Sequence, residues 1–146
     1  MHTRHATRMM LALTCLALSS LGAASCNDSN GTPSAGEGAI SASVKDYEIA
    51  LASVSATSGE VSFSIENQGP STHEFVVIRS DTPPDQLPVE SGLISEDGID
   101  LVGEAEDIAP STTAELILDL QPGAYVIMCN ISGHYEKGMH TGFTVR

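Results

Sequence analysis

The stretch YVIMCNISGHYEKGMHTGFTV at residues 125–145 contains Cys129, His134 and Met139, and successive donors lie five positions apart. Residues five apart sit about 140° apart on an α-helix, and on one strand residues 129 and 134 would point to opposite faces. A loop can bring such donors together, and a glycine precedes both the histidine and the methionine. We therefore expect Cys129 to end a strand, His134 to lie at a loop crest and Met139 to lie near the start of the last strand.

The sequence around this stretch has the pattern of β-strands. Hydrophobic and polar residues alternate at 61–66 and 114–120, which is typical of strands with one face in a core. The runs at 73–78 and 124–130 are mostly apolar on both faces, as in the interior of a sandwich. Because short strands are separated by polar turns, we predict an all-β domain over residues 39–146. Its predicted architecture is an antiparallel Greek-key β-sandwich or barrel.

Residues 80–110 differ from the rest of this domain. They contain many aspartates and glutamates and four prolines, and neither lysine nor arginine. We expect a long excursion between two strands here, with room for one short helical turn.

The N-terminus has the plan of an export signal. A basic start is followed by an apolar run over residues 9–21 and then by small residues, so we predict a signal peptide over residues 1–25. The alternative of a transmembrane anchor needs about 20 apolar residues, and this run is shorter. Residues 21–26, LGAASC, resemble a bacterial lipobox, which implies lipidation of Cys26, although Ala23 stands where leucine is favoured. Cleavage that leaves Cys26 unmodified is the alternative. We expect residues 26–38 to carry the lipid and form a flexible tether.

Charge and cysteine content restrict the possible partners. The chain has a formal charge of −13, and removal of residues 1–25 would leave four basic against all 19 acidic side chains. This balance argues against binding to nucleic acid and to anionic membrane surfaces. If Cys26 is lipidated, Cys129 is the one remaining thiol, and such a cysteine is expected to be paired, reactive or metal-bound. A Cys26–Cys129 disulfide is the plain alternative.

The donor types point to copper. A thioether is a soft ligand that suits copper and is a poor ligand for zinc, calcium or magnesium. A blue-copper centre needs two histidines, one cysteine and a weak axial methionine, so one more histidine is required. His73 opens an apolar strand and fits that role, whereas His140 follows Met139 directly and is expected at the surface. Taken singly, His73 could be a polar strand end, Met139 core filling and Cys129 an inert buried thiol, so the prediction depends on their combination.

Residues 125–145 resemble the C-terminal signature of the cupredoxins, C-x4-H-x4-M, and residues 67–77, NQGPSTHEFVV, resemble their upstream histidine strand. The spacing is similar to that of azurin, rusticyanin and auracyanin. The resemblance implies one copper ion per chain, with His73, Cys129 and His134 as equatorial ligands and Met139 as the axial ligand. Glu74 follows the first histidine where many cupredoxins have Asn or Ser. Its backbone N–H remains able to donate to the Cys129 sulfur.

These residues predict a membrane-tethered blue-copper electron-transfer protein that is not an enzyme, because no coordination position is left for a substrate. Copper storage or delivery is the alternative within the copper-binding class, and a metal-free β-sandwich binding module is the alternative outside it. We expect an exported monomer, lipid-anchored on the outer (periplasmic or extracellular) face of a membrane. Its expected partners are redox proteins such as a basic cytochrome c, which the acidic segment 80–110 would attract. Solubility or adaptation to salt is the alternative explanation of those charges.

Overall fold

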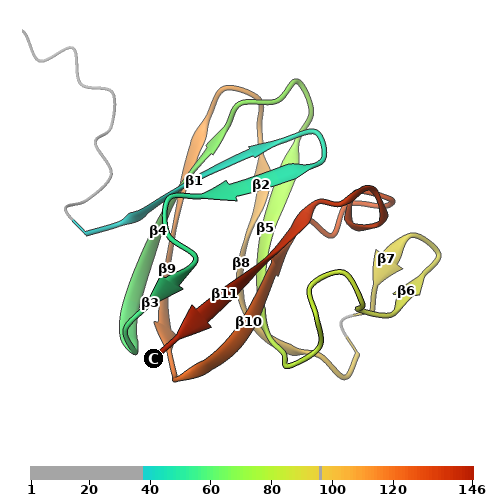
Figure 1. Cartoon of the computed structure of the whole chain (residues 1–146). Helices are drawn as coiled ribbons and strands as arrows, with labels where there is room; N and C mark the ends of the chain where they lie inside the picture. Colours follow the sequence, from blue (N-terminus) through green and yellow to red (C-terminus); the bar gives the residue numbers. More distant parts are fainter. Residues whose placement is uncertain (1–37, 96) are drawn as a thin grey trace, which may run out of the picture. The chain divides into compact units, whose positions relative to one another are not determined.

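The structure is a computed structural model that describes residues 38–95 and 97–146. Two sheets pack face to face as a β-sandwich (Figure 1). The first sheet has the order β2-β1-β4-β9, with bounds β1 Ile40–Lys45, β2 Glu48–Leu51, β4 Gly59–Asn67 and β9 Thr113–Leu120. The second has the order β3-β11-β10-β5-β8, with bounds β3 Ser55–Ala56, β5 His73–Arg79, β8 Asp100–Ile108, β10 Gly123–Met128 and β11 His140–Val145.

The all-β sandwich predicted from the sequence is therefore confirmed. Most neighbouring strands are antiparallel, but β1 pairs with β4 in parallel and β11 pairs with β3 in parallel. Both sheets are mixed, because hydrophobic alternation specifies which face of a strand is buried and does not specify its partner. Among the described residues, no helix has the length and apolar character that crossing a bilayer requires.

The main core lies between the sheets. Inward side chains of β4 contact those of β5 and β11. Phe63 packs against Phe75 and Phe143, and the ring centroids are 5.4 Å apart in each pair. All three rings are almost completely buried. Aromatic pairs of this kind stabilise a core by about 0.5–1.5 kcal/mol each beyond the burial of their area.

A second, smaller cluster covers the outer face of the second sheet. Strands β5 and β10 are apolar on both faces because Val76, Ile78, Val126 and Met128 point away from the main core. The chain between β5 and β8 covers these side chains with Leu87 and Ile94. This arrangement explains why the two runs lack hydrophobic alternation.

The acidic segment is more regular than the sequence suggested. The expected excursion holds for residues 80–99, which contain the hairpin of β6 Val89–Glu90 and β7 Leu93–Ile94. The prediction was wrong for Asp100–Ile108, which form the nine-residue strand β8 at the edge of the second sheet. An edge strand with charged side chains is a common protection against unwanted strand pairing. None of the described residues of the segment forms a helix.

Candidate metal centre

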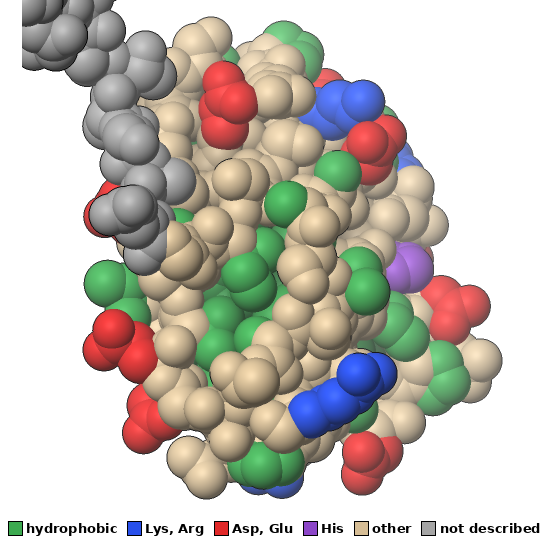
Figure 2. All heavy atoms as spheres, turned by 60° about the vertical axis from the view of Figure 1, so that its left-hand side comes forward, with side chains coloured by type: hydrophobic (Ala, Val, Ile, Leu, Met, Phe, Trp, Pro, Cys, Tyr) green, Lys and Arg blue, Asp and Glu red, His purple; other side chains and the backbone are tan. Residues whose placement is uncertain are grey.

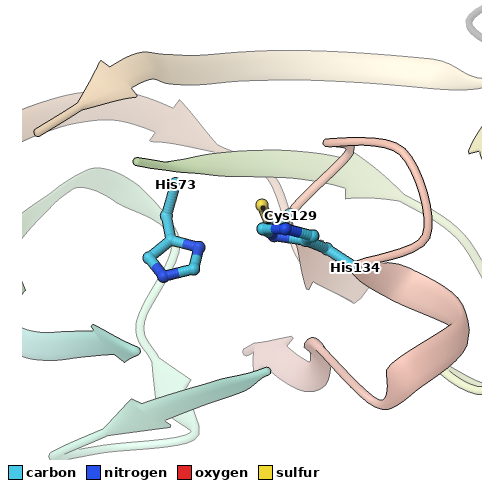
Figure 3. Close-up of side chains that lie close together, drawn as sticks. All are labelled: His73, Cys129 and His134. Atoms are coloured by element: carbon cyan, nitrogen blue, oxygen red, sulfur yellow. Dashed lines mark hydrogen bonds between the residues drawn. The ribbon is translucent and has the colours of Figure 1, made fainter. Parts of the chain in front are cut away.

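Three predicted donors converge at one end of the sandwich. His73 is the first residue of β5, Cys129 follows β10 directly, and His134 lies in the loop between β10 and β11. One potential ligand atom from each of the three residues lies within 4.8 Å of the others. Figure 3 shows the Cys129 sulfur and the His134 ring side by side, with one nitrogen of the His73 ring turned toward them.

The positions of His73 and Cys129 follow from the two-residue period of their strands. Phe75 and Val77 point from β5 into the main core, and His73 precedes them in the same row. Tyr125 and Ile127 point inward from β10, so the next position in that row is Cys129. Because β5 and β10 are neighbouring strands, the two donors meet at the ends of adjacent inward rows.

The loop between β10 and β11 is closed by backbone hydrogen bonds. Met139 N–H donates to the His134 carbonyl oxygen at 3.1 Å, and Cys129 N–H donates to the Met139 carbonyl oxygen at 3.1 Å. Between them lies the 3₁₀ turn η1, Tyr135–Lys137, which ends at Gly138 with a φ of 103°. A side chain at Gly138 would be strained in this left-handed conformation. The expected placement of Cys129, His134 and Met139 at strand end, loop and strand start is therefore confirmed.

Met139 is completely buried and belongs to the same cluster as Cys129. Its main chain is bonded to Cys129 and to His134 through the two bonds described above. This places the residue beside the donors, and its role as an axial ligand stays a prediction.

The Cys129 sulfur is a free, completely buried thiol, as a metal ligand would be before binding. Cys26, its partner in the alternative disulfide, lies outside the described residues. The sulfur of Cys129 accepts a hydrogen bond from the backbone N–H of Glu74 at 3.3 Å, which confirms that expected contact, and lies 3.4 Å from His134 Nδ1. Burial raises the pKa of this thiol, and the N–H groups of Glu74 and Ile131 oppose that rise. A bound cation would favour the thiolate, so metal binding here should release a proton.

The His73 ring is completely buried. Within residues 38–95 and 97–146, neither of its ring nitrogens has a hydrogen-bond partner. Nε2 lies 3.0 Å from Asp46 Oδ1, within ion-pair distance, but the angle is not that of a hydrogen bond. Unpaired polar groups in a core cost roughly 1–3 kcal/mol, so a buried imidazole with a free nitrogen facing a thiol and a second imidazole fits a metal ligand.

His134 is the more exposed of the two histidines. Partial burial lowers the pKa of its ring, as do the nearby positive charges of His73, when protonated, and of Lys137, while Asp46 opposes this shift. A lowered pKa keeps the ring neutral at neutral pH, which is the form that binds metals. Tyr47 packs edge-on against the ring at a centroid distance of 5.2 Å, and Lys137 Nζ lies 4.3 Å from the centre of the Tyr47 ring.

Two expectations at the site need adjustment. His140 was expected at the surface, but it is half-buried and packs on Tyr135 with ring centroids 4.8 Å apart. It lies outside the cluster of three donors. The sequence reasoning also missed Asp46 and Tyr47, which approach the two imidazoles from the turn between β1 and β2. No signal in the sequence links this turn to the donors.

The donor set fits copper. Two imidazoles, one thiol and the thioether of Met139 are soft to intermediate ligands that suit copper. The chain is a β-sandwich, and the donor cluster lies at one end of the buried faces of its strands. This combination defines the chain as a cupredoxin, the class of blue-copper proteins. Copper is the cofactor of this class, and His73, Cys129, His134 and Met139 are placed to hold one ion.

Comparison with known proteins gives the family. The model of the sulfocyanin (SoxE) domain matches residues 16–146, so the chain belongs to the sulfocyanin family of cupredoxins. No curated protein matches its sequence. Membership in this family supports electron transfer by copper as the function, since cupredoxins are electron carriers rather than enzymes.

Solved structures support the fold at low sequence identity. Auracyanin from Roseiflexus castenholzii is 16% identical, with a TM-score of 0.59, over 75% of this chain and 97% of auracyanin. Auracyanin B is 18% identical, with a TM-score of 0.58, over 74% of this chain and 88% of that protein. Rusticyanin from Thiobacillus ferrooxidans is 16% identical, with a TM-score of 0.57, over 73% of this chain and 75% of that protein.

Proposed function

We propose that this sulfocyanin carries single electrons between redox proteins while it is tethered by a lipid on Cys26 to the outer face of a membrane. The observation that carries the electron-transfer part is the convergence of His73, Cys129 and His134 within 4.8 Å. Copper supplies a one-electron change between Cu(I) and Cu(II) when it is bound. The chain's own residues position the donors, exclude water and provide an exit for the electron.

The donors are held by elements that leave them little freedom. His73 and Cys129 continue rows of buried side chains on adjacent strands, and the loop of His134 is fixed by backbone bonds at both ends. A site held this firmly changes shape little when the charge changes, and small rearrangement favours fast electron transfer. Cys129 would give up its proton when it holds a metal ion, and the N–H of Glu74 is placed to donate to its sulfur.

The electron should leave through His134. His73 and Cys129 are completely buried, whereas His134 is only half-buried. Transient redox encounters use small contact surfaces, and the ring of His134 offers a short path to such a surface. The partner proposed here is a basic redox protein of the cytochrome c type, because the chain carries 19 acidic against six basic side chains.

The acidic side chains favour the approach of a cationic partner. On the face drawn in Figure 2, they stand at separate places around the molecule, and basic side chains are few. A dispersed negative charge raises the rate of encounter with a cationic partner, and added salt lowers that rate. We therefore expect the second-order rate of reduction by a basic cytochrome c to fall as ionic strength rises, and a rate independent of salt would argue against such a partner.

Copper titration of the purified chain with an optical spectrum tests the central proposal. We expect uptake of one copper ion, an intense blue absorption band and reversible loss of that band on reduction. A colourless site that binds Cu(I) and passes it to an acceptor would support copper storage or delivery instead. No uptake of copper would leave only a metal-free binding module.

Membrane attachment needs a separate test, because residues 1–37 lie outside the described part of the chain. We expect the full chain to enter the membrane fraction of a bacterial host and to incorporate labelled fatty acid. The variant Cys26→Ser should be soluble and unlabelled after export. Membrane retention of Cys26→Ser would contradict lipid anchoring at this residue. We expect the released protein to be a monomer in solution.

A further inference from the structure

We propose that Asp46 is a positioning residue for the metal centre. Its carboxylate fixes the tautomer of His73 and favours the oxidised state of the site. This inference rests on the proposed function of copper electron transfer. Asp46 lies in the turn between β1 and β2, on the sheet opposite the strand that carries His73. Its carboxylate thus reaches the site across the sandwich.

The first argument is the position of the two carboxylate oxygens. Oδ1 lies 3.0 Å from His73 Nε2, and Oδ2 accepts a hydrogen bond from Ser71 Oγ at 3.1 Å. Ser71 belongs to the turn that leads into His73, so the carboxylate contacts both the ligand and the turn that positions it. One-third of the Asp46 side chain is exposed (32%), whereas the histidine is completely buried.

The second argument is the close approach of two backbone segments. A Cβ atom added at Gly69 would lie 3.0 Å from Lys45 Cα, 3.2 Å from Asp46 N and 3.2 Å from His73 Nε2. The absence of a side chain at position 69 therefore lets the turn between β1 and β2 lie close against the histidine, and any larger residue would push these segments apart by a few tenths of an ångström. The same turn places Tyr47 at a φ of 99°, a conformation that aromatic residues rarely adopt. Tyr47 is held there by Lys137, whose Nζ donates to its hydroxyl at 3.1 Å.

These contacts determine the chemistry of the His73 ring. A carboxylate oxygen 3.0 Å from Nε2 would repel a lone pair there, so the neutral ring must carry its proton on Nε2. Nδ1 then keeps its lone pair, and this is the nitrogen on the side of Cys129 and His134 (Figure 3). A carboxylate beside the far nitrogen of a metal-bound histidine orients the ring and increases its basicity. Its negative charge also favours the more positive, oxidised state of the centre.

The experiment compares the reduction potential of the copper-loaded full chain with that of the variant Asp46→Asn. This substitution keeps a hydrogen-bond acceptor and removes the negative charge. Loss of such outer contacts typically weakens metal binding roughly 10–100-fold. Because Asp46 is partly exposed, we expect binding of Cu(II) relative to Cu(I) to fall by about tenfold, a rise in potential of about 59 mV for one electron. The matched control is Glu48→Gln, which removes an exposed carboxylate at the start of β2 that is paired with Lys45 at 3.3 Å.

A second readout needs no metal. In the metal-free wild type, ¹⁵N NMR of the His73 ring should show the proton on Nε2. Asp46→Ala should give a mixture of tautomers, and Asp46→Asn should keep the wild-type tautomer. If Asp46→Asn does not fold, Ser71→Ala serves instead, because it removes the hydrogen bond that holds the carboxylate. Its reduction potential should rise by less than that expected for Asp46→Asn.

The outcomes separate this inference from the proposed function. A wild-type chain without a reversible copper couple would overturn the function itself. A normal couple that is unchanged in Asp46→Asn, or shifted equally in Glu48→Gln, would overturn the role of Asp46. A wild-type His73 with its proton on Nδ1 would overturn it as well.

Discussion

Replacement of Asn67 by alanine tests how the turn before His73 is held in place. Asn67 is the last residue of β4, and its side chain is completely buried. Its amide nitrogen donates to the carbonyl oxygens of Ser71 at 2.8 Å and Ile108 at 2.7 Å, and its amide oxygen accepts from Gly69 N–H at 2.9 Å. One side chain thus bonds the turn at both its start and its end, and joins it to the end of β8.

The magnitude follows from these three bonds. Each buried hydrogen bond contributes about 1 kcal/mol net, so Asn67→Ala should lower the free energy of unfolding by about 3 kcal/mol. Domains of this kind are stabilised by roughly 5–15 kcal/mol in total, so the loss is a large fraction. With a urea m-value of about 1–3 kcal/mol/M, the midpoint should move down by roughly 1–3 M. Copper affinity should fall too, because binding would then have to order the turn that carries His73.

The measurement is urea unfolding of the metal-free chain, followed by copper titration. Gln68→Ala is the matched control, since Gln68 lies in the same turn and its exposed side chain donates a hydrogen bond to the Glu66 carboxylate at 2.7 Å. Such surface changes usually stay within about 0.5 kcal/mol. If Asn67→Ala lost less than about 1 kcal/mol, or no more than Gln68→Ala, the turn would be held by something other than this amide.

Three further predictions concern the donors and the neighbouring His140. Cys129→Ser should abolish the blue band while the apo fold persists in circular dichroism, and a retained band would remove Cys129 from the site. Met139→Leu should keep copper and raise the potential measured by voltammetry, since only a weak ligand is lost; complete loss of metal would mean that Met139 is a stronger ligand than expected. In the metal-free protein, burial lowers the pKa of His134 and His140 below 6.5, so the unfolded chain binds more protons in acid. The free energy of unfolding should therefore fall as pH drops below about 6.5. A curve that is flat between pH 7 and pH 5 would contradict the shifts.

The sequence was sufficient to predict the sandwich and the meeting of three donors. Alternation along β4 and β9 indicated one buried face, and the even spacing of Cys129, His134 and Met139 excluded a helix or a strand as their common support. The alternation and the spacing are local signals, whereas His73 lies far from the other donors in the sequence and was inferred because a blue-copper centre needs a second histidine. The four donors also combine in an order that isolated histidines and cysteines rarely show.

Strand β8 was missed because its residues satisfy two demands at once. It pairs with β5 on one side and forms the edge of its sheet, so charged side chains are acceptable along it. In the sequence, those charges and the nearby prolines conceal the strand pattern. The parallel pairing of β1 with β4 was missed for another reason, since alternation carries no information on pairing partners.

Asp46 illustrates the limit of reading donors from a sequence. It lies on the other sheet from His73, and Gly69 favours its contact with the ring because two backbone segments approach each other closely there. The cluster of three donors belongs to the second sheet and its loop, whereas the contacts that orient both imidazoles come from the first. Without the first sheet, Nε2 of His73 would lack the Asp46 carboxylate and the ring of His134 would lack its contact with Tyr47. The metal centre therefore depends on the packing of both sheets, and copper affinity should follow the stability of the whole sandwich rather than that of the loop.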